Sequence, residues 1–109
     1  MPEDDAGLVI LNNRKQTTMV QTFEEFTARS VEEGFDEVLV REWQPHMVVE
    51  THTHPFDVSA VVERGELVLT VGDKAITLKA GDPFRLGRDI PHVEHYGPEG
   101  ATVWVARAN

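Results

Sequence analysis

The chain has 109 residues, which is a typical length for one domain. Its 19 acidic and 10 basic residues give a net charge of −9, which repels nucleic-acid phosphates and anionic lipid surfaces. The absence of cysteine excludes disulfides, thiolate metal sites and cysteine nucleophiles. We therefore expect one folded domain that binds neither nucleic acid nor a membrane.

The N-terminal segment is acidic and then briefly apolar. Met1–Gly7 lacks the basic-then-apolar order of a signal peptide, so we expect a cytoplasmic protein. The run Leu8–Leu11 (LVIL) has two interpretations: an edge strand, or an arm that pairs with a second chain. The second interpretation predicts a homodimer with a swapped strand.

A helix is predicted over Thr22–Gly34. Thr22 and Glu25 have the spacing of a capping box, and Gly34 is a typical stop. An apolar stripe would face the rest of the protein, formed by Phe23, Phe26 and Val31.

From Glu37 onward the pattern is that of β-strands, rich in Val, Leu, Phe, Trp and Thr. Glycine-containing turns separate eight predicted strands: Glu37–Trp43, Met47–His54, Val58–Val62, Glu66–Val71, Lys74–Leu78, Pro83–Leu86, Pro91–Tyr96 and Thr102–Arg107. So many short strands predict an all-β antiparallel sandwich or barrel. We divide this single domain into an N-terminal arm and short helix (1–37) and a β-barrel (38–109).

Three histidines form a candidate metal site. On a strand, residues i and i+2 point to the same face, so His52 and His54 would lie side by side. His92 begins another strand and would join them if the two strands are neighbours. Three neutral imidazoles suit Fe, Mn, Ni, Cu or Zn and leave coordination positions open for a substrate. The alternative is that the His-x-His pair lies on a solvent-facing strand and binds nothing.

Two stretches resemble the motifs of the cupin superfamily. His52–Glu66 (HTHPFDVSAVVERGE) is similar to the first, G-x5-H-x-H-x3,4-E-x6-G, and Gly81–Tyr96 (GDPFRLGRDIPHVEHY) to the second, G-x5-P-x-G-x2-H-x3-N. The resemblance implies a cupin-type double-stranded β-helix, also called a jelly-roll barrel. It also implies that His52, His54 and His92 are the metal ligands.

The sequence departs from both motifs. Val58 stands at the position of the glutamate ligand, and His46 where the first motif begins with glycine. In the second motif, Gly87, Asp89 and Tyr96 replace proline, glycine and asparagine. Asp57 is adjacent to Val58 but should point to the opposite face unless a bulge turns it inward. The site is then either a three-histidine centre, as in some cupin dioxygenases, or one that has lost its metal.

Strand alternation names further candidates for the inner face. It places Val48, Glu50 and Val58 beside the histidines of the first motif, and Glu94 and Tyr96 beside His92. Glu50 would be a fourth ligand, a general base, the orienting partner of an imidazole, or a rim residue in water, and Glu94 has the same alternatives. Tyr96 would be a proton donor to the substrate or a core tyrosine.

Two functions of different classes follow. The first is a metal-dependent enzyme, dioxygenase- or isomerase-like, in which His52, His54 and His92 hold the ion while Glu50 and Tyr96 assist catalysis. Three neutral ligands leave the full charge of a divalent ion, which favours a small anionic chelating substrate. The second is a non-catalytic barrel that binds or senses a small ligand and requires no metal.

Overall fold

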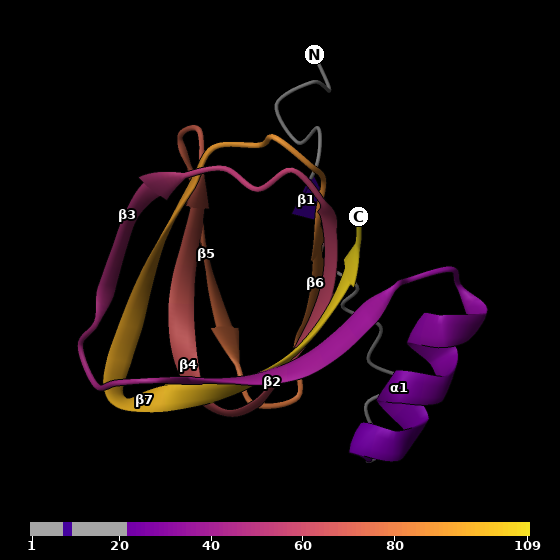
Figure 1. Ribbon diagram of the computed structural model, residues 1–109. Coiled ribbons are helices and arrows are strands. Elements are labelled where there is room, and N and C mark those ends of the chain that lie inside the picture. Colours follow the sequence, from indigo (N-terminus) through magenta and orange to yellow (C-terminus); the bar gives the residue numbers. More distant parts are fainter. Residues whose placement is uncertain (1–7, 10–21) are drawn as a thin grey trace.

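Seven antiparallel strands curve around a common centre, and one helix lies outside them beside β2 (Figure 1). The computed structural model describes residues 8–9 and 22–109. The elements are β1 (Leu8–Val9), α1 (Phe23–Glu32), β2 (Glu37–Trp43), β3 (Val48–His52), β4 (Asp57–Val71), β5 (Lys74–Lys79), β6 (Pro83–Leu86) and β7 (His92–Ala108). The expected all-β fold with one short helix is confirmed.

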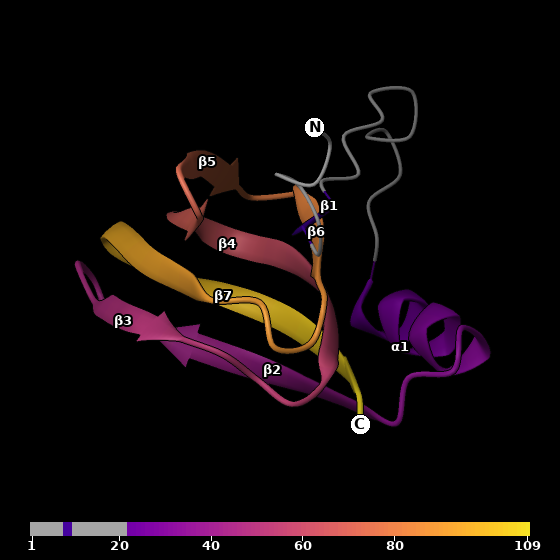
Figure 2. The same ribbon diagram turned by 90° about the horizontal axis from the view of Figure 1, so that it is seen from above.

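The two long strands, β4 and β7, organise the sheet. The main path runs β1-β6-β4-β7-β2, while β5 also pairs with β4 and β3 with β7. Viewed from above, β2 and β3 lie on one side of β7, and β4, β5 and β6 form the facing side (Figure 2). Strands near the middle and the end of the sequence are therefore neighbours, which brings the two histidine-bearing segments together: His52 on β3 is directly opposite His92 on β7.

β4 and β7 each join two strands that the sequence pattern separates at a turn signal. In β4 the pairing with β7 shifts register between Val62 and Arg64 and again between Gly65 and Leu67. Gly65 has a φ of +82°, and a Cβ there would lie 2.0 Å from the Gly100 carbonyl oxygen. The glycines at Gly65 and Gly100 therefore mark close-packed bends within continuous strands, and the predicted breaks at these places are wrong.

The helix begins as the sequence predicts. The Thr22 hydroxyl accepts from the Glu25 amide, and the Glu25 carboxylate accepts from the Thr22 amide, both at 3.0 Å. The buried face consists of Phe26 and Ser30, one helical turn apart. Val31 is 61% exposed, so its predicted place in the apolar stripe is wrong.

Two apolar clusters lie on the two faces of the sheet. The larger lies on the inner face of the barrel and consists of side chains from β4, β5, β6 and β7. The smaller lies under α1, where Phe26 packs with Val61 and Ala106, and Phe23 and Trp104 complete it. Burial of these side chains holds the helix against the outside of the barrel.

The N-terminal run is described only in part. Leu8–Val9 pairs with Leu86 and Arg85 of β6 in the same chain, which is the edge-strand interpretation of the LVIL run. Ile10 and Leu11 lie outside the described residues. Within the described part of the chain, no helix is long and apolar enough to span a membrane.

Candidate metal centre

A cavity of about 290 Å³ lies inside the barrel. Its walls are mostly apolar, with Val58, Leu69 and Phe84 among the lining side chains. The polar and charged side chains that line it come from three strands, β2, β3 and β7, and from the segment after β3: Arg41, His52, His54, His92, Glu94, Tyr96 and Arg107. A largely apolar pocket with a few convergent polar groups is the usual form of a small-molecule site.

The three predicted histidines meet in this cavity. One ring nitrogen from each of His52, His54 and His92 lies within 4.8 Å of the other two. The ring centroids are 4.2 Å apart for His52 and His92, and 4.8 Å for His54 and His92. The His-x-His alternation and the pairing of β3 with β7 therefore produce the convergence that the sequence predicts.

Backbone carbonyls fix which nitrogen faces the cavity. Nδ1 of His52 lies 2.7 Å from the Glu50 carbonyl oxygen, and Nδ1 of His92 lies 2.8 Å from that of Ile90. A carbonyl can only accept, so each Nδ1 carries a proton, and in the neutral imidazole each Nε2 then keeps its lone pair. This is the tautomer and the outer hydrogen bond that metal-ligating histidines use. The ring of His54 is held differently, by parallel stacking on Phe56 at 4.8 Å.

His92 provides the observation that tests the site for a metal. Its side chain is 1% exposed, and its Nε2 makes no hydrogen bond of regular geometry among the described residues, although the Glu94 carboxylate lies 3.4 Å away. A buried polar atom without a well-formed hydrogen bond is costly and calls for an explanation. Three imidazoles that each offer one ring nitrogen to the same point fit a first-row divalent transition ion.

A bulge in β3 determines which side chains of this strand enter the cavity with His52. The pairing of β3 with β7 is regular at Val48 and Val49 and shifts before His52. As a result Val49 and His52, three residues apart, both line the cavity. The simple alternation that would place Val48 and Glu50 inside is therefore wrong: both side chains are exposed, and Glu50 does not line the cavity.

The carboxylate that enters the site is Glu94. Its Oε2 lies 3.5 Å from His52 Nε2 and 3.4 Å from His92 Nε2. Its other oxygen, Oε1, accepts a hydrogen bond from the Tyr96 hydroxyl at 2.5 Å. Both side chains line the cavity, as alternation from His92 predicts along the regular part of β7.

The charges of these groups depend on one another. Burial, followed by the neighbouring His92 and His52, lowers the pKa of His54 to about 4. Burial acts to lower the pKa of His92, but the Glu94 carboxylate and the Ile90 carbonyl outweigh it and leave that pKa raised. Burial also acts to raise the pKa of Glu94, but its contacts with His92 and Tyr96 outweigh it, so the pKa is lowered and the carboxylate is ionised. Burial and the charge of Glu94 raise the pKa of Tyr96, so its hydroxyl keeps the proton.

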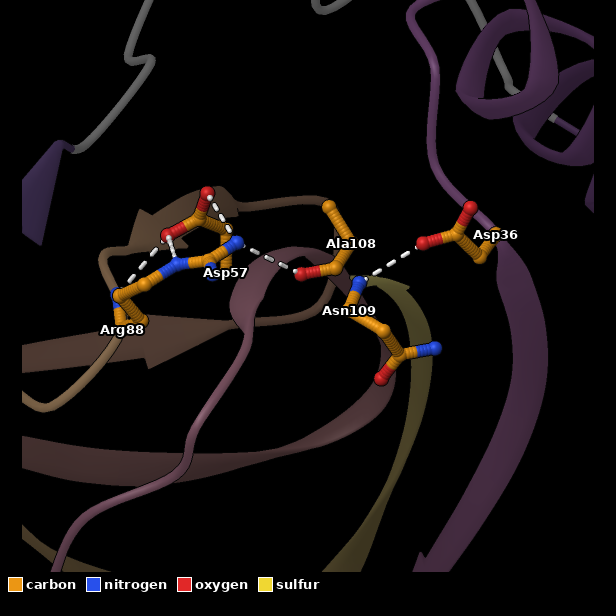
Figure 3. Close-up of polar contacts among 5 residues, drawn as sticks. All are labelled: Asp36, Asp57, Arg88, Ala108 and Asn109. Atoms are coloured by element: carbon orange, nitrogen blue, oxygen red, sulfur yellow. Dashed lines mark hydrogen bonds and ion pairs between the residues drawn. The ribbon is translucent and has the colours of Figure 1, made fainter.

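Val58, at the position of the motif glutamate, and the adjacent Asp57 point to the faces of β4 that strand alternation predicts. Val58 is buried and lines the cavity, while the Asp57 carboxylate is 45% exposed and turned away from it. Asp57 accepts from the Arg88 amide at 2.8 Å and from the Arg88 guanidinium, which also donates to the Ala108 carbonyl (Figure 3). Asp57 thus has a structural partner and offers no ligand atom to the histidines.

Two cavity residues, Arg41 and Arg107, are absent from the sequence-based candidates. Each continues an otherwise apolar series of alternate residues, Leu39 and Trp43 around Arg41, and Val103 and Val105 before Arg107. A charged side chain at an inward position of an apolar series is the signal that would have identified them. Two other arginines have ion-pair partners away from the cavity: Arg85 pairs with Glu33, and Arg88 with Asp57.

Residues 39–105 match the cupin domain family, which covers more than half of the chain. The chain is a cupin. Two departures from the cupin motifs keep the backbone that a glycine would adopt: His46 and Asp89 stand at motif glycines and have φ values of 60° and 61°. The cupin therefore preserves the geometry of both motif loops with other side chains. No curated protein matches the sequence.

Solved structures share the fold. A conserved protein with a double-stranded β-helix domain from Klebsiella pneumoniae is 26% identical, with a TM-score of 0.59 over 69% of this chain and 68% of that one. A protein of unknown function from Rhizobium leguminosarum is 17% identical, with a TM-score of 0.62 over 65% and 67%. A chain from the structures of the DMSP lyases RdDddP and RnDddQII is 18% identical, with a TM-score of 0.61 over 66% and 37%. The cupin-type double-stranded β-helix predicted from the sequence is thus confirmed.

Proposed function

We propose that this cupin is a metal-dependent enzyme that acts on a small anionic chelating molecule. The observation that carries the proposal is the pair of Nδ1–carbonyl contacts, which leave the Nε2 atoms of His52 and His92 as free ligands beside His54. These three histidines would hold Fe, Mn, Ni, Cu or Zn. A divalent ion bound there supplies Lewis acidity and open coordination positions to a chelating anion.

Glu94 takes the role that the family motif gives to the residue at Val58. In a tetrahedral site with bonds of about 2.1 Å, neighbouring ligand atoms are about 3.4 Å apart. Glu94 Oε2 has this spacing from both His52 Nε2 and His92 Nε2, at 3.5 and 3.4 Å. Glu94 is therefore our fourth ligand, in place of Glu50, whose side chain is exposed. A chelating anion would then bind by displacing the Glu94 carboxylate or by raising the coordination number above four.

Tyr96 positions that ligand. Its hydroxyl donates to Glu94 Oε1, and its ring stacks on Trp43 at 4.8 Å, so both ends of the side chain are held. The hydroxyl keeps its proton because its pKa is raised. Its single O–H fixes the carboxylate with Oε2 toward the histidines, and it would donate to an oxygen of the substrate only if that oxygen displaced Glu94 Oε1.

A catalytic function is favoured over a barrel that only binds a ligand. A wholly apolar lining would suit binding alone, but this cavity combines apolar walls with an ionised carboxylate, a phenol and two arginines. One structural neighbour comes from the structures of DMSP lyases, so this fold also hosts enzymes. Oxygen insertion and a proton shift are the two reaction classes that we consider, and uptake of dioxygen distinguishes them.

Elemental analysis tests the proposal first. The purified protein would be compared, after removal of any tag, with the His52→Ala/His54→Ala double variant, because an acidic surface also collects stray cations. Near-stoichiometric transition metal in the wild type, absent from the variant, supports the site and justifies oxygen-electrode screens with small chelating acids. Equal trace metal in both proteins, even after loading, would exclude the metal centre.

A further inference from the structure

A guanidinium group lies on the cavity wall near the histidines. Arg107 Cζ lies 4.7 Å from the centre of the Phe56 ring, and Phe56 stacks in turn on His54 at 4.8 Å with the rings nearly parallel. The Phe56 ring therefore lies between the Arg107 guanidinium and the imidazole of His54, one of the proposed metal ligands. Such a cation–π contact fixes a guanidinium without using its N–H donors.

A second guanidinium on the cavity wall is held in the same way, by Trp43. Arg41 Cζ lies 4.7 Å from the Trp43 ring centre, and Trp43 stacks on Tyr96 at 4.8 Å. Arg41 and Arg107 lie on the neighbouring strands β2 and β7, with the pair Leu39–Val105 between them in the register. Both side chains line the cavity.

The donors of these arginines are largely unused. Arg107 Nε is buried with no hydrogen-bond partner among the described residues, and Nη1 reaches only Glu37 Oε1, at 3.5 Å, whose side chain is 51% exposed. In the described part of the chain, the Arg41 guanidinium contacts Trp43 and has neither a hydrogen bond nor an ion pair. Partly buried cations with free donors are costly unless an anion joins them.

Nothing in the cavity wall supplies that anion. Glu94 is the carboxylate of the lining, and its two oxygens are turned to Tyr96 and to the histidines. The chain as a whole has a net charge of −9, so the two arginines are a local positive region within an acidic protein. A guanidinium with free donors matches a carboxylate in both charge and shape.

We propose that Arg41 and Arg107 form a carboxylate subsite, so that the substrate is a small acid with two anionic groups. One group chelates at the histidines, and the other accepts from the guanidinium donors. The cavity, about 290 Å³, is at the small end of ligand sites and suits an acid of a few carbon atoms. This inference rests on the proposed function for the chelating end, whereas the arginine end is measurable without metal.

The probes are succinate and its dimethyl ester, which has the same carbon skeleton but no carboxylate. Thermal shifts are measured at millimolar probe on protein stripped with a chelator and dialysed, and again after loading with Mn²⁺. We expect succinate to raise the melting temperature of the stripped wild type more than the ester does, because a carboxylate binds the arginines. Titration calorimetry then gives the affinities.

Arg41→Gln and Arg107→Gln should each weaken succinate binding by about tenfold or more, as expected for a charged hydrogen bond, and reduce its advantage over the ester. The matched control is Arg29→Gln, which makes the same charge change on the exposed face of α1 and should leave the advantage intact. Arg107→Lys keeps the positive charge but not the planar guanidinium, and this variant should bind succinate with an affinity between those of the wild type and Arg107→Gln. This result would show that the loss in Arg107→Gln comes from lost recognition of the carboxylate and not from misfolding.

The proposal is overturned if succinate and the ester bind the wild type equally, or if Arg29→Gln weakens binding as much as the cavity variants do. It is also overturned if Arg41→Gln and Arg107→Gln fold and bind succinate as the wild type does. Failure of the metal proposal is distinct: the wild type then contains no bound metal and Mn²⁺ changes nothing, while the arginine dependence persists in the stripped protein.

Discussion

The Tyr96 hydroxyl donates a hydrogen bond of 2.5 Å to Glu94 Oε1, which leaves Glu94 Oε2 facing His52 and His92. The Glu94 carboxylate thus lies between the Tyr96 hydroxyl, which keeps its proton because its pKa is raised, and the Nε2 atoms of His52 and His92. The same strand, β7, carries His92, Glu94 and Tyr96 on one face, so its regular alternation sets the geometry of this chain of contacts.

Replacing Glu94 tests whether its carboxylate is a ligand. Tyr96→Phe removes the orienting hydrogen bond and should weaken Co²⁺ binding by about tenfold, the lower limit for such outer partners. Glu94→Gln removes the charge as well and should weaken Co²⁺ binding further. Titration calorimetry and the visible spectrum of bound Co²⁺ measure affinity and coordination together.

Glu50→Gln is the matched control, because it makes the same change on β3, two residues before His52, at a side chain that is exposed. It should leave both the affinity and the Co²⁺ spectrum unchanged. A larger loss in Glu50→Gln than in Glu94→Gln would contradict our assignment and return Glu50 to the site.

The bend at Gly65 predicts a large difference between two glycine substitutions. Gly72→Ala meets no atom within 4 Å and should cost only the strain of its φ of +63°, about 1–2 kcal/mol. Gly65→Ala combines a φ of +82° with a backbone oxygen 2.0 Å from the new Cβ, so the two strands must separate. Gly65→Ala should therefore lose clearly more free energy of unfolding than Gly72→Ala in urea denaturation, and equal losses would show that the bend is not tightly packed.

The residues of the regular strand segments could be predicted from the sequence. Alternation along β7 places His92, Glu94 and Tyr96 correctly, and alternation along β4 places Val58 inside and Asp57 outside. The physical reason is that a side chain in an unbroken ladder has no choice of face once its neighbour is fixed.

Alternation fails where the backbone leaves the ladder. The bulge before His52 exchanges the faces of Val49 and Glu50, and no residue type in that segment announces it. Gly65 and Gly100 lie in sequence segments that are typical of turns, yet each lies at a bend within a continuous strand. At these bends two backbones are in contact, and a local sequence pattern does not predict such a tertiary contact. Arg41 and Arg107 are absent from the sequence-based candidates for a different reason. Alternation predicts their face, but a charged residue within an apolar series does not by itself indicate a binding site.

Packing of α1 predicts the energetic link between the helix and the barrel. Phe26 is 3% exposed and lies 6.0 Å from the Trp104 ring on β7. Phe26→Ala should cost about 3–5 kcal/mol of unfolding free energy in a single cooperative transition, since it leaves a cavity between helix and sheet. Val31→Ala on the same helix changes an exposed side chain and should stay within about 0.5 kcal/mol of the wild type. A small effect of Phe26→Ala, or a separate early transition, would mean that α1 is not part of the cooperative domain.

The ion pair of Asp57 and Arg88 should make stability depend on pH in a defined direction. Hydrogen bonds from the Arg88 guanidinium and amide lower the pKa of Asp57 below its ordinary value of 3.8. A carboxylate with a lowered pKa stabilises the folded state above the pKa of the unfolded chain, and this contribution is lost as pH falls toward the folded value. Asp57→Asn should therefore be less stable than the wild type at pH 7, with a difference that shrinks by pH 3, as measured by urea midpoints at each pH.

Asp73→Asn, at the exposed β4–β5 turn, controls for the loss of one negative charge. A difference for Asp57→Asn that stays constant from pH 7 to pH 3 would show that the Asp57 contacts with Arg88 do not depend on its charge.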